Sequence, residues 1–198
     1  MITAADYITF EQFLDDPTID EHHEWVDGKV VPMHAVADGH DAVTRWLNEL
    51  LGFYVRHRRL GRLLGEPFVM KLDDPPVGRS PDLMFVATDH LDRIRANYLD
   101  GPADLVIEVL SPGTRVQDCV HKFGEYERGG VPEYWIVDPD GDDTAFHRRD
   151  DSGRFQAIPL TDGIYRPEQW PEASIDPAWF TQMRLPDPFD LWRQWGVL

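Results

Sequence analysis

DLVIEVL, residues 104–110, is a nearly continuous apolar run whose interior holds one carboxylate, Glu108. The runs DLMFVA (82–87) and EYWIVD (133–138) have the same character. Ser-Pro and Pro-Asp-Gly sequences, which favour turns, bound the three runs. Apolar runs of this length are typical of central strands that are covered on both faces of a sheet. The three runs therefore predict a buried β-sheet at the centre of the fold.

The segments around these runs predict helices and further strands. Apolar periodicity predicts helices at 3–16, with Thr3 as a cap, at 40–59, and at 115–128, where Gly129-Gly130 end the helix. A hairpin is predicted at 24–34 around the turn Asp27-Gly28. Strands are predicted at 63–72, 144–148 and 154–159. This order is typical of an α/β fold with a mixed β-sheet flanked by helices, an N-terminal hairpin and extra C-terminal strands. The length suits one domain, so we expect residues 1–198 to form a single unit.

The stretch from about 161 to 198 is rich in proline and differs from the rest of the chain. It carries Trp170, Trp179, Trp192 and Trp195. Four large aromatic side chains need an apolar surface to cover them. We therefore expect this tail to pack on the body of the chain or on a second subunit.

Charge and cysteine content exclude several classes of protein. The chain has 19 Lys and Arg against 36 Asp and Glu, a formal net charge of −17. This balance argues against a broad basic surface that gathers nucleic acid by counterion release. A single cysteine, Cys119, excludes an internal disulfide framework and any multi-cysteine metal site. No apolar run is long enough for a transmembrane helix, and the acidic N-terminus lacks the layout of a signal peptide. We expect a cytoplasmic protein, monomeric or homo-oligomeric.

Two carboxylates stand out as candidates for chemistry. Glu108 lies inside a buried strand, where an unpaired carboxylate costs several kcal/mol and requires a metal, a cation or a proton. Asp82 follows Pro81 at the start of another buried strand. If the two strands are neighbours, both carboxylates meet at one end of the sheet and form an oxygen-rich site for Mg²⁺ or Mn²⁺. The alternatives are a structural acid paired with Arg or Lys at Glu108, and a simple turn residue at Asp82.

The helix after Glu108 offers a cation. Asp118, Lys122 and Tyr126 recur at i, i+4 and i+8, so they share one face of a helix. The long Lys122 side chain can return its ammonium group to the carboxylates, where it would orient a water or stabilise developing negative charge. Alternatively, Lys122 is a solvated residue supported by Asp118, and Tyr126 is a packing residue.

Two upstream residues are candidate metal ligands. Glu24 opens the hairpin and His40 opens the long helix, and both residue types bind Mg²⁺ or Mn²⁺. The alternatives are a hairpin salt bridge at Glu24, and a structural or solvated histidine at His40, which is the commoner role of a histidine at a helix start. The one basic stretch, residues 56–62, either contacts phosphate or offsets the dipole at the end of the long helix.

Several motifs, in a fixed order, resemble the Uma-two family of the PD-(D/E)XK, restriction-endonuclease-like superfamily. They are EWVDGK (24–29), His40 at a helix start, Ser80-Pro81-Asp82, GPADLVIEVLSP (101–112), Asp118-x-x-x-Lys122-x-x-x-Tyr126 and GVPEYW (130–135). The resemblance covers roughly residues 5–150. It implies a restriction-endonuclease-like core that binds Mg²⁺ or Mn²⁺ and hydrolyses phosphodiester bonds of nucleic acid, and the habit of the superfamily implies a homodimer.

The resemblance also implies roles for single residues. Asp82 matches the Asp of the superfamily motif, and Glu108 matches its second acid. The motif lysine normally lies two residues after that acid, where this chain has Leu110. Lys122 matches the relocated lysine of this branch.

Two hypotheses from different classes follow. The first is a metal-dependent endonuclease in which Asp82 and Glu108, with Glu24 or His40, hold the metal and Lys122 assists the attacking water. Its acidic surface favours a small or single-stranded substrate, or one that a partner protein delivers. The second is a nuclease-like fold without catalysis that serves assembly or binding. The convergence of Asp82, Glu108 and Lys122 distinguishes the two.

Overall fold

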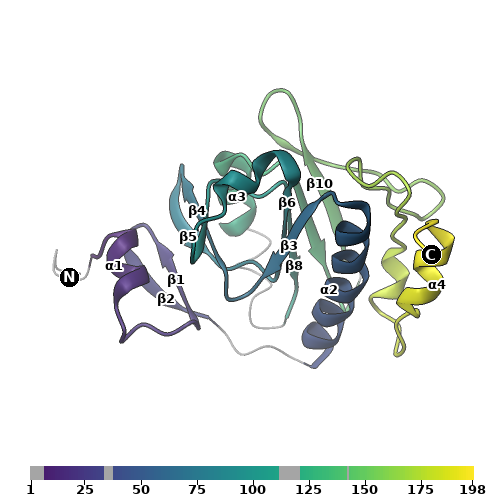
Figure 1. Ribbon diagram of the computed structural model, residues 1–198, viewed down its shortest axis with the longest axis horizontal. Helices are drawn as coiled ribbons and strands as arrows, with labels where there is room; N and C mark the ends of the chain where they lie inside the picture. The colour runs from purple at the N-terminus through teal and green to yellow at the C-terminus, as the bar shows by residue number, and fades with distance from the viewer. Residues whose placement is uncertain (1–6, 34–37, 112–120, 142) are drawn as a thin grey trace.

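The computed structural model describes residues 7–33, 38–111, 121–141 and 143–198 (Figure 1). Its helices are α1 (Phe10–Asp15), α2 (Asp38–Arg58), α3 (Phe123–Gly129) and α4 (Pro188–Gln194), with the 3-10 turns η2 (Thr88–Arg93) and η4 (Pro177–Trp179). Its strands are β1 (His23–Val26), β2 (Lys29–Pro32), β3 (Gly61–Gly65), β4 (Val69–Asp73), β5 (Pro76–Arg79), β6 (Leu83–Ala87), β7 (Tyr98–Asp100), β8 (Leu105–Val109), β9 (Glu133–Val137), β10 (Ala145–Arg149) and β11 (Phe155–Ala157). The helices lie between groups of strands along the chain, in a mixed α/β fold as expected.

The described strands form two mixed sheets. The larger has the order β11-β10-β9-β8-β6-β3, with β8 and β9 parallel and the other pairs antiparallel. The smaller has the order β2-β1-β5-β4-β7. The three apolar runs of the sequence become β6, β8 and β9, which lie side by side inside the larger sheet. Their prediction as central strands is confirmed.

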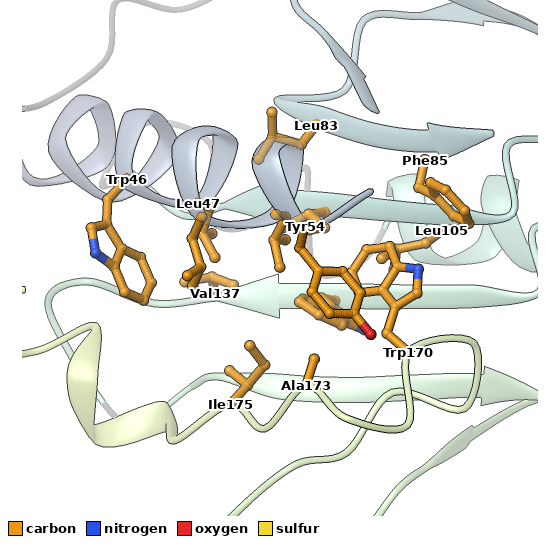
Figure 2. Packing of buried hydrophobic residues seen from close by; sticks show 14 of the residues in the cluster. Trp46, Leu47, Tyr54, Leu83, Phe85, Leu105, Val137, Trp170, Ala173 and Ile175 are labelled. Carbon is orange, nitrogen blue, oxygen red and sulfur yellow. The ribbon is translucent and has the colours of Figure 1, made fainter. Parts of the chain in front are cut away.

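One face of the larger sheet packs against α2 and the C-terminal tail. Figure 2 shows Trp46, Leu47 and Tyr54 of α2 on one side of this core and Trp170 of the tail facing Tyr54. The whole tail contributes buried side chains to the same core: Tyr165, Trp170, Ala173, Ile175, Phe180, Leu191, Trp192, Trp195 and Val197. The tail therefore packs on the body of its own chain, and α4 lies alongside α2 (Figure 1).

The other face of the larger sheet meets α3 and the smaller sheet. Met84, Val86 and Val106 of the larger sheet share a core with Met70 and Leu72 of the smaller one. A third, smaller core joins α1 to β1 and β4 of the smaller sheet through Phe10, Phe13, Trp25 and Val69. The space between the two sheets is therefore apolar except at one end, where the carboxylates gather.

The prediction of one strand over residues 63–72 is wrong. The segment contributes β3 to the larger sheet and β4 to the smaller one, with Glu66-Pro67 between them. Proline has no N–H for a strand ladder, so a proline within an apolar run marks a break between strands. The short strands β5 and β7, which carry few apolar residues, were not predicted from sequence.

Other boundaries shift or cannot be compared. The first helix begins at Phe10, and Thr9 is its N-cap in a capping box with Gln12. Thr3 lies outside the described residues, as does the first part of the helix expected at 115–128, with Asp118 and Cys119. The end of that helix at Gly130 is confirmed, since Gly130 adopts the left-handed conformation. Within the described ranges, no helix is long and apolar enough to cross a membrane.

Candidate active site

The register of the larger sheet brings Asp82 and Glu108 together. Leu83 pairs with Ile107 in the antiparallel ladder of β6 and β8, so the next residues along, Asp82 and Glu108, lie opposite each other at one end. Directly opposed side chains of an antiparallel pair point to the same face. Asp82 Oδ2 accepts the N–H of Val109 at 2.7 Å, which fixes this carboxylate against the end of β8. Both carboxylates are buried.

Helix α3 covers Glu108 with two donors. Lys122 Nζ donates to Glu108 Oε2 at 2.9 Å, and Tyr126 Oη donates to Glu108 Oε1 at 2.7 Å. Burial, followed by the negative charge of Glu108, raises the pKa of Tyr126 well above its ordinary value, so the phenol stays protonated. The four-residue spacing thus places both Lys122 and Tyr126 on Glu108. The sequence predicted the return of Lys122 to the carboxylates, but not the contact between Tyr126 and Glu108. The buried acid is therefore paired with this lysine.

The smaller sheet adds a second charged group. Trp25 pairs with Gly78 in the ladder of β1 and β5, which places Glu24 beside Arg79. Arg79 Nη1 donates to Glu24 Oε2 at 2.6 Å, and its Nε and Nη2 form a bidentate pair with Glu125 at 2.7 and 2.8 Å. Burial lowers the pKa of Arg79, but Glu125 and Glu24 outweigh burial and raise it. The guanidinium is therefore a permanent cation at the junction of β1, β5 and α3.

Lys122 links the two groups. Its Nζ lies 4.0 Å from Glu24 Oε1, while the other contact of that oxygen is the N–H of Ser80 at 3.2 Å. Glu24 is thus held by Arg79 and by the N–H of Ser80. Its contact with Arg79 is the salt bridge that was one of the two interpretations of this residue from sequence. It still stands within reach of the same ammonium group as Glu108.

His40 joins the site from α2. It is buried in the first turn of that helix, and its Nε2 lies 3.0 Å from Asp82 Oδ1. The long helix therefore delivers one imidazole to the same end of the sheet as the two carboxylates. Residues from four separate segments, at 24, 40, 82 and 108, thus lie at this end of the larger sheet.

Glu66 is a neighbour that the sequence analysis did not single out. Gly65 pairs with Leu83 in the ladder of β3 and β6, so Glu66 follows on beside Asp82. Burial, followed by the charge of Asp82, raises the pKa of Glu66. Arg79 and Glu125 were also missed, although Arg79 directly precedes the Ser80-Pro81-Asp82 motif. A cation next to a motif with a buried carboxylate is the signal that would have found it.

Two carboxylates are the candidate ligands for a divalent cation. Among the described residues, no group of three or more His, Cys, Asp or Glu side chains is arranged to hold a metal ion. Mg²⁺ does not require one, because it keeps several waters and is commonly held by one or two carboxylates. Asp82 and Glu108 provide such a pair, with His40 beside Asp82. Among the described residues, four buried carboxylates, Asp82, Glu108, Glu24 and Glu125, lie close to the basic side chains of Arg79 and Lys122.

Comparisons with known proteins agree with this architecture. A crystal structure described as a putative nuclease belonging to DUF820, from Anabaena variabilis, superimposes with a TM-score of 0.68. The two sequences are 19% identical, and the match covers 95% of this chain and 99% of that one. At this identity the likeness shows a shared fold. No curated protein matches the chain.

The family comparison is specific. The chain matches the model of the Uma2 family, described as "Putative restriction endonuclease", over residues 10–177. The matched segment contains every residue of the site described above, from Glu24 to Tyr126. Because the match spans most of the sequence and all of its buried polar site, the chain belongs to the Uma2 family.

Proposed function

We propose that this protein is a metal-dependent endonuclease that hydrolyses phosphodiester bonds of nucleic acid. The observation that carries the proposal is the convergence of Asp82, Glu108 and Lys122, with Lys122 Nζ 2.9 Å from Glu108. Buried carboxylates at one end of a sheet with an ammonium group beside them are expected at a site for phosphodiester chemistry. Membership of a family described as "Putative restriction endonuclease" supports the same reaction class.

In this proposal Asp82 and Glu108 hold Mg²⁺ or Mn²⁺, and His40 and Glu24 stand as further ligands. When bound, the divalent cation supplies Lewis-acid stabilisation of the phosphate oxygens. Lys122 orients the attacking water or stabilises the charge that develops in the transition state. Tyr126, which stays protonated, holds the Glu108 carboxylate in place, and Arg79 holds Glu24.

The position of Lys122 offsets the departure of Leu110 from the superfamily motif. Leu110 is buried in the apolar core between the sheets and carries no charge to the site. The ammonium group of Lys122 reaches Glu108 from α3 instead of from the strand. The proposal therefore keeps the two acids and the lysine of the motif, as Asp82, Glu108 and Lys122. The lysine comes from the segment that begins α3 and not from β8.

The substrate of this proposal is limited by the charge of the protein. A net charge of −17 opposes tight binding of long duplex DNA. We therefore propose a single-stranded or short substrate, or one that a partner protein delivers, and a homodimer is a further part of the proposal.

The test is cleavage of labelled single-stranded DNA, duplex DNA and RNA in Mg²⁺, in Mn²⁺ and in EDTA. We expect cleavage of at least one substrate with metal and none in EDTA. Glu108→Gln keeps an acceptor for Tyr126, and Lys122→Met keeps the aliphatic stem, so both variants should fold and lose more than 100-fold in rate. Glu21→Gln, an exposed carboxylate near the hairpin, is the matched control and should cleave like the wild type.

Metal binding provides a second, independent measurement. Calorimetry with Mn²⁺ should show binding to the wild type and a loss in Asp82→Asn. Absence of both cleavage and Mn²⁺ binding in the folded wild type would refute the proposal and leave the alternative of a nuclease-like module for assembly or binding.

A further inference from the structure

A groove lies outside the candidate active site, between α2, β3 and α4. It encloses about 650 Å³, and its walls include Gly52, Phe53 and Arg56 of α2, Arg62 of β3, and Phe189 and Trp192 of α4. The groove uses the second half of α2, whereas His40 at the start of that helix faces Asp82. The two sites therefore share a helix but not residues.

Two arginines give the groove a positive wall. Arg56 and Arg62 are exposed, and neither makes an ion pair or side-chain hydrogen bond with any residue in the described ranges. Arg58, by contrast, donates to the carbonyls of Trp195 and Gly196. In a chain of net charge −17, two cations that have no carboxylate partner among the described residues are available for an anionic ligand.

An exposed aromatic ring stands at the opposite wall. Phe189 is 54% exposed, an unusual exposure for a side chain of its size. It contacts Trp192 with ring centroids 5.1 Å apart, and Trp192 in turn lies 4.2 Å from Phe53. Trp192 is buried and donates its indole N–H to the carbonyl of Leu50 at 2.9 Å. The fixed Trp192 thus supports Phe189 as a platform for a flat ligand.

Strand β3 connects the groove to the candidate active site. It is the edge strand of the larger sheet, with Arg62 opposite Val86 and Gly65 opposite Leu83. Leu83 is the residue after Asp82, so the groove and the carboxylates lie near the two ends of one short strand. Three residues of an antiparallel strand span about 10 Å. A flexible polyanion held at Asp82 can therefore continue along the edge of the sheet to Arg62.

We propose that this groove binds a single-stranded segment of the nucleic acid whose scissile phosphate is held at Asp82 and Glu108. Arg56 and Arg62 contact its phosphates, and Phe189 stacks on one unpaired base. The inference rests on the proposed nuclease function and names its substrate as single-stranded. Arginine with an accessible aromatic ring is the combination that single-strand binding sites use, because every base has a face that can stack. A duplex keeps its bases stacked and offers none to Phe189.

The test is the affinity of a labelled 12-nucleotide single strand, measured by fluorescence anisotropy in EDTA so that no cleavage occurs. We expect Arg56→Glu/Arg62→Glu to weaken binding at least tenfold. The matched control, Arg166→Glu/Arg184→Glu, makes the same change in net charge at exposed arginines outside the groove and should weaken it less than twofold. A neutral pair of variants, Arg56→Gln/Arg62→Gln, should reduce the slope of log Kd against log salt by about 1.4, as expected for two phosphate contacts on a single strand.

Two further variants test the aromatic wall and the remaining charge. Phe189→Leu keeps an apolar side chain but lacks a ring face, and it should weaken binding about tenfold, while Phe189→Trp should restore it. Glu49→Gln removes the one carboxylate in the described lining and should tighten binding about twofold.

The outcomes separate this inference from the proposed function. The proposal for the groove is refuted if the groove variant and the control variant lose equal affinity for the single strand. It is also refuted if a duplex binds as tightly as the single strand. A dimer in light scattering that becomes monomeric in Phe189→Leu also overturns it and makes the groove an interface between copies. If the wild type cleaves and the arginine variant keeps its KM, the proposal for the groove is wrong, while the proposal of nuclease activity is supported. If the arginines determine binding but no metal supports cleavage, the nuclease proposal fails alone.

Discussion

Glu108 and Lys122 form a buried ion pair whose energetics differ from those of a surface pair. Glu108 is 2% exposed and Lys122 7% exposed, so water screens neither charge well. Removal of one partner leaves the other charge buried, whereas removal of both takes both charges out of the site. The stability of single variants at Glu108 therefore measures the loss of the pair and does not by itself reveal a catalytic role.

This asymmetry gives a testable prediction. We expect Glu108→Ala and Lys122→Met each to lower the free energy of unfolding by roughly 3–5 kcal/mol in metal-free buffer. The double variant should cost clearly less than the sum of the two, with a coupling of at least about 1 kcal/mol. Urea unfolding of the four proteins checks this. Additive losses would show that the two side chains do not interact in solution.

A second buried carboxylate, Glu133, predicts a pH dependence of stability. It accepts hydrogen bonds from Trp135 Nε1 at 2.6 Å and from the hydroxyl of Tyr165. Burial raises its pKa above the ordinary value of 4.5, and these two hydrogen bonds only partly offset the rise. A raised folded-state pKa contributes stability that is complete below about pH 4.5 and is lost as pH rises through the folded-state pKa.

Glu133→Gln should remove this dependence. We expect the variant to gain stability relative to the wild type between pH 4.5 and pH 8, by ~1.4 kcal/mol for each unit of the pKa rise. Urea unfolding at a series of pH values measures the difference. Glu21→Gln, at an exposed acid in the N-terminal part of the chain, serves as the control, and its stability difference from the wild type should not change with pH. If the stability difference between Glu133→Gln and the wild type does not change with pH, burial does not raise the pKa of Glu133.

Sequence reasoning predicted single residues of the site where a local conflict marked them. Glu108 conflicts with its apolar strand, and Lys122 and Tyr126 repeat at helical spacing, so these residues were found. Arg79 and Glu125 come from elements 46 residues apart and show no conflict in their own segments. Their bidentate pair exists only because β5 and α3 pack together, which a single sequence does not encode locally.

At the level of the elements, strands with a continuous apolar pattern were predictable and short polar strands were not. The central strands β6, β8 and β9 are apolar throughout, so burial on both faces determines their pattern. β5, with the sequence PVGR, carries no such pattern but is held between β1 and β4. The division into two sheets follows from partner choice at Glu66-Pro67, which depends on tertiary packing.

Helix α3 carries the donors that hold Glu108, so its end affects the site. Gly130 ends the helix with φ +88°, a conformation that strains any residue with a Cβ. We expect Gly130→Ala to lower the free energy of unfolding by about 1 kcal/mol. Gly124→Ala, inside the same helix and with only the end of Arg128 near its new Cβ, should instead raise it by about 0.5–1 kcal/mol.

Thermal unfolding of the two variants checks the contrast, because both add the same methyl group to one short helix. Equal shifts of Tm in one direction would contradict the argument from backbone conformation. Glu108, which α3 contacts through Lys122 and Tyr126, should keep these donors in both variants at temperatures where the protein is folded.

At the level of the whole molecule, the two faces of the larger sheet differ, because one carries most of the aromatic core and the other carries the candidate active site. Its α2 face packs against the tail in one large aromatic core, while its other face carries Asp82 and Glu108 between the two sheets. The sequence indicated a tail that docks, from its four tryptophans, but did not indicate which face it would cover. The structure places it away from the carboxylates and beside the groove that ends at α4.

This separation gives the last prediction, at Trp170. Its side chain is fully buried, with ring contacts to Tyr54, Phe85 and Trp135 at 5.1–6.2 Å between centroids. Trp170→Ala leaves a large cavity and should lower the free energy of unfolding by roughly 3–5 kcal/mol. Trp170→Phe should cost less, because it fills more of the space and removes an indole N–H that has no acceptor among the described residues. Trp179→Ala, at the half-buried edge of the core, is the control and should cost less than Trp170→Ala.

Urea unfolding gives the stabilities of these variants. Mn²⁺ calorimetry at 15 °C tests the folded site, where the affinity for Mn²⁺ should stay within about twofold of the wild type. A loss of metal affinity in folded Trp170→Ala would show that the aromatic core positions the carboxylates through the sheet, and that stability and chemistry are coupled in this fold.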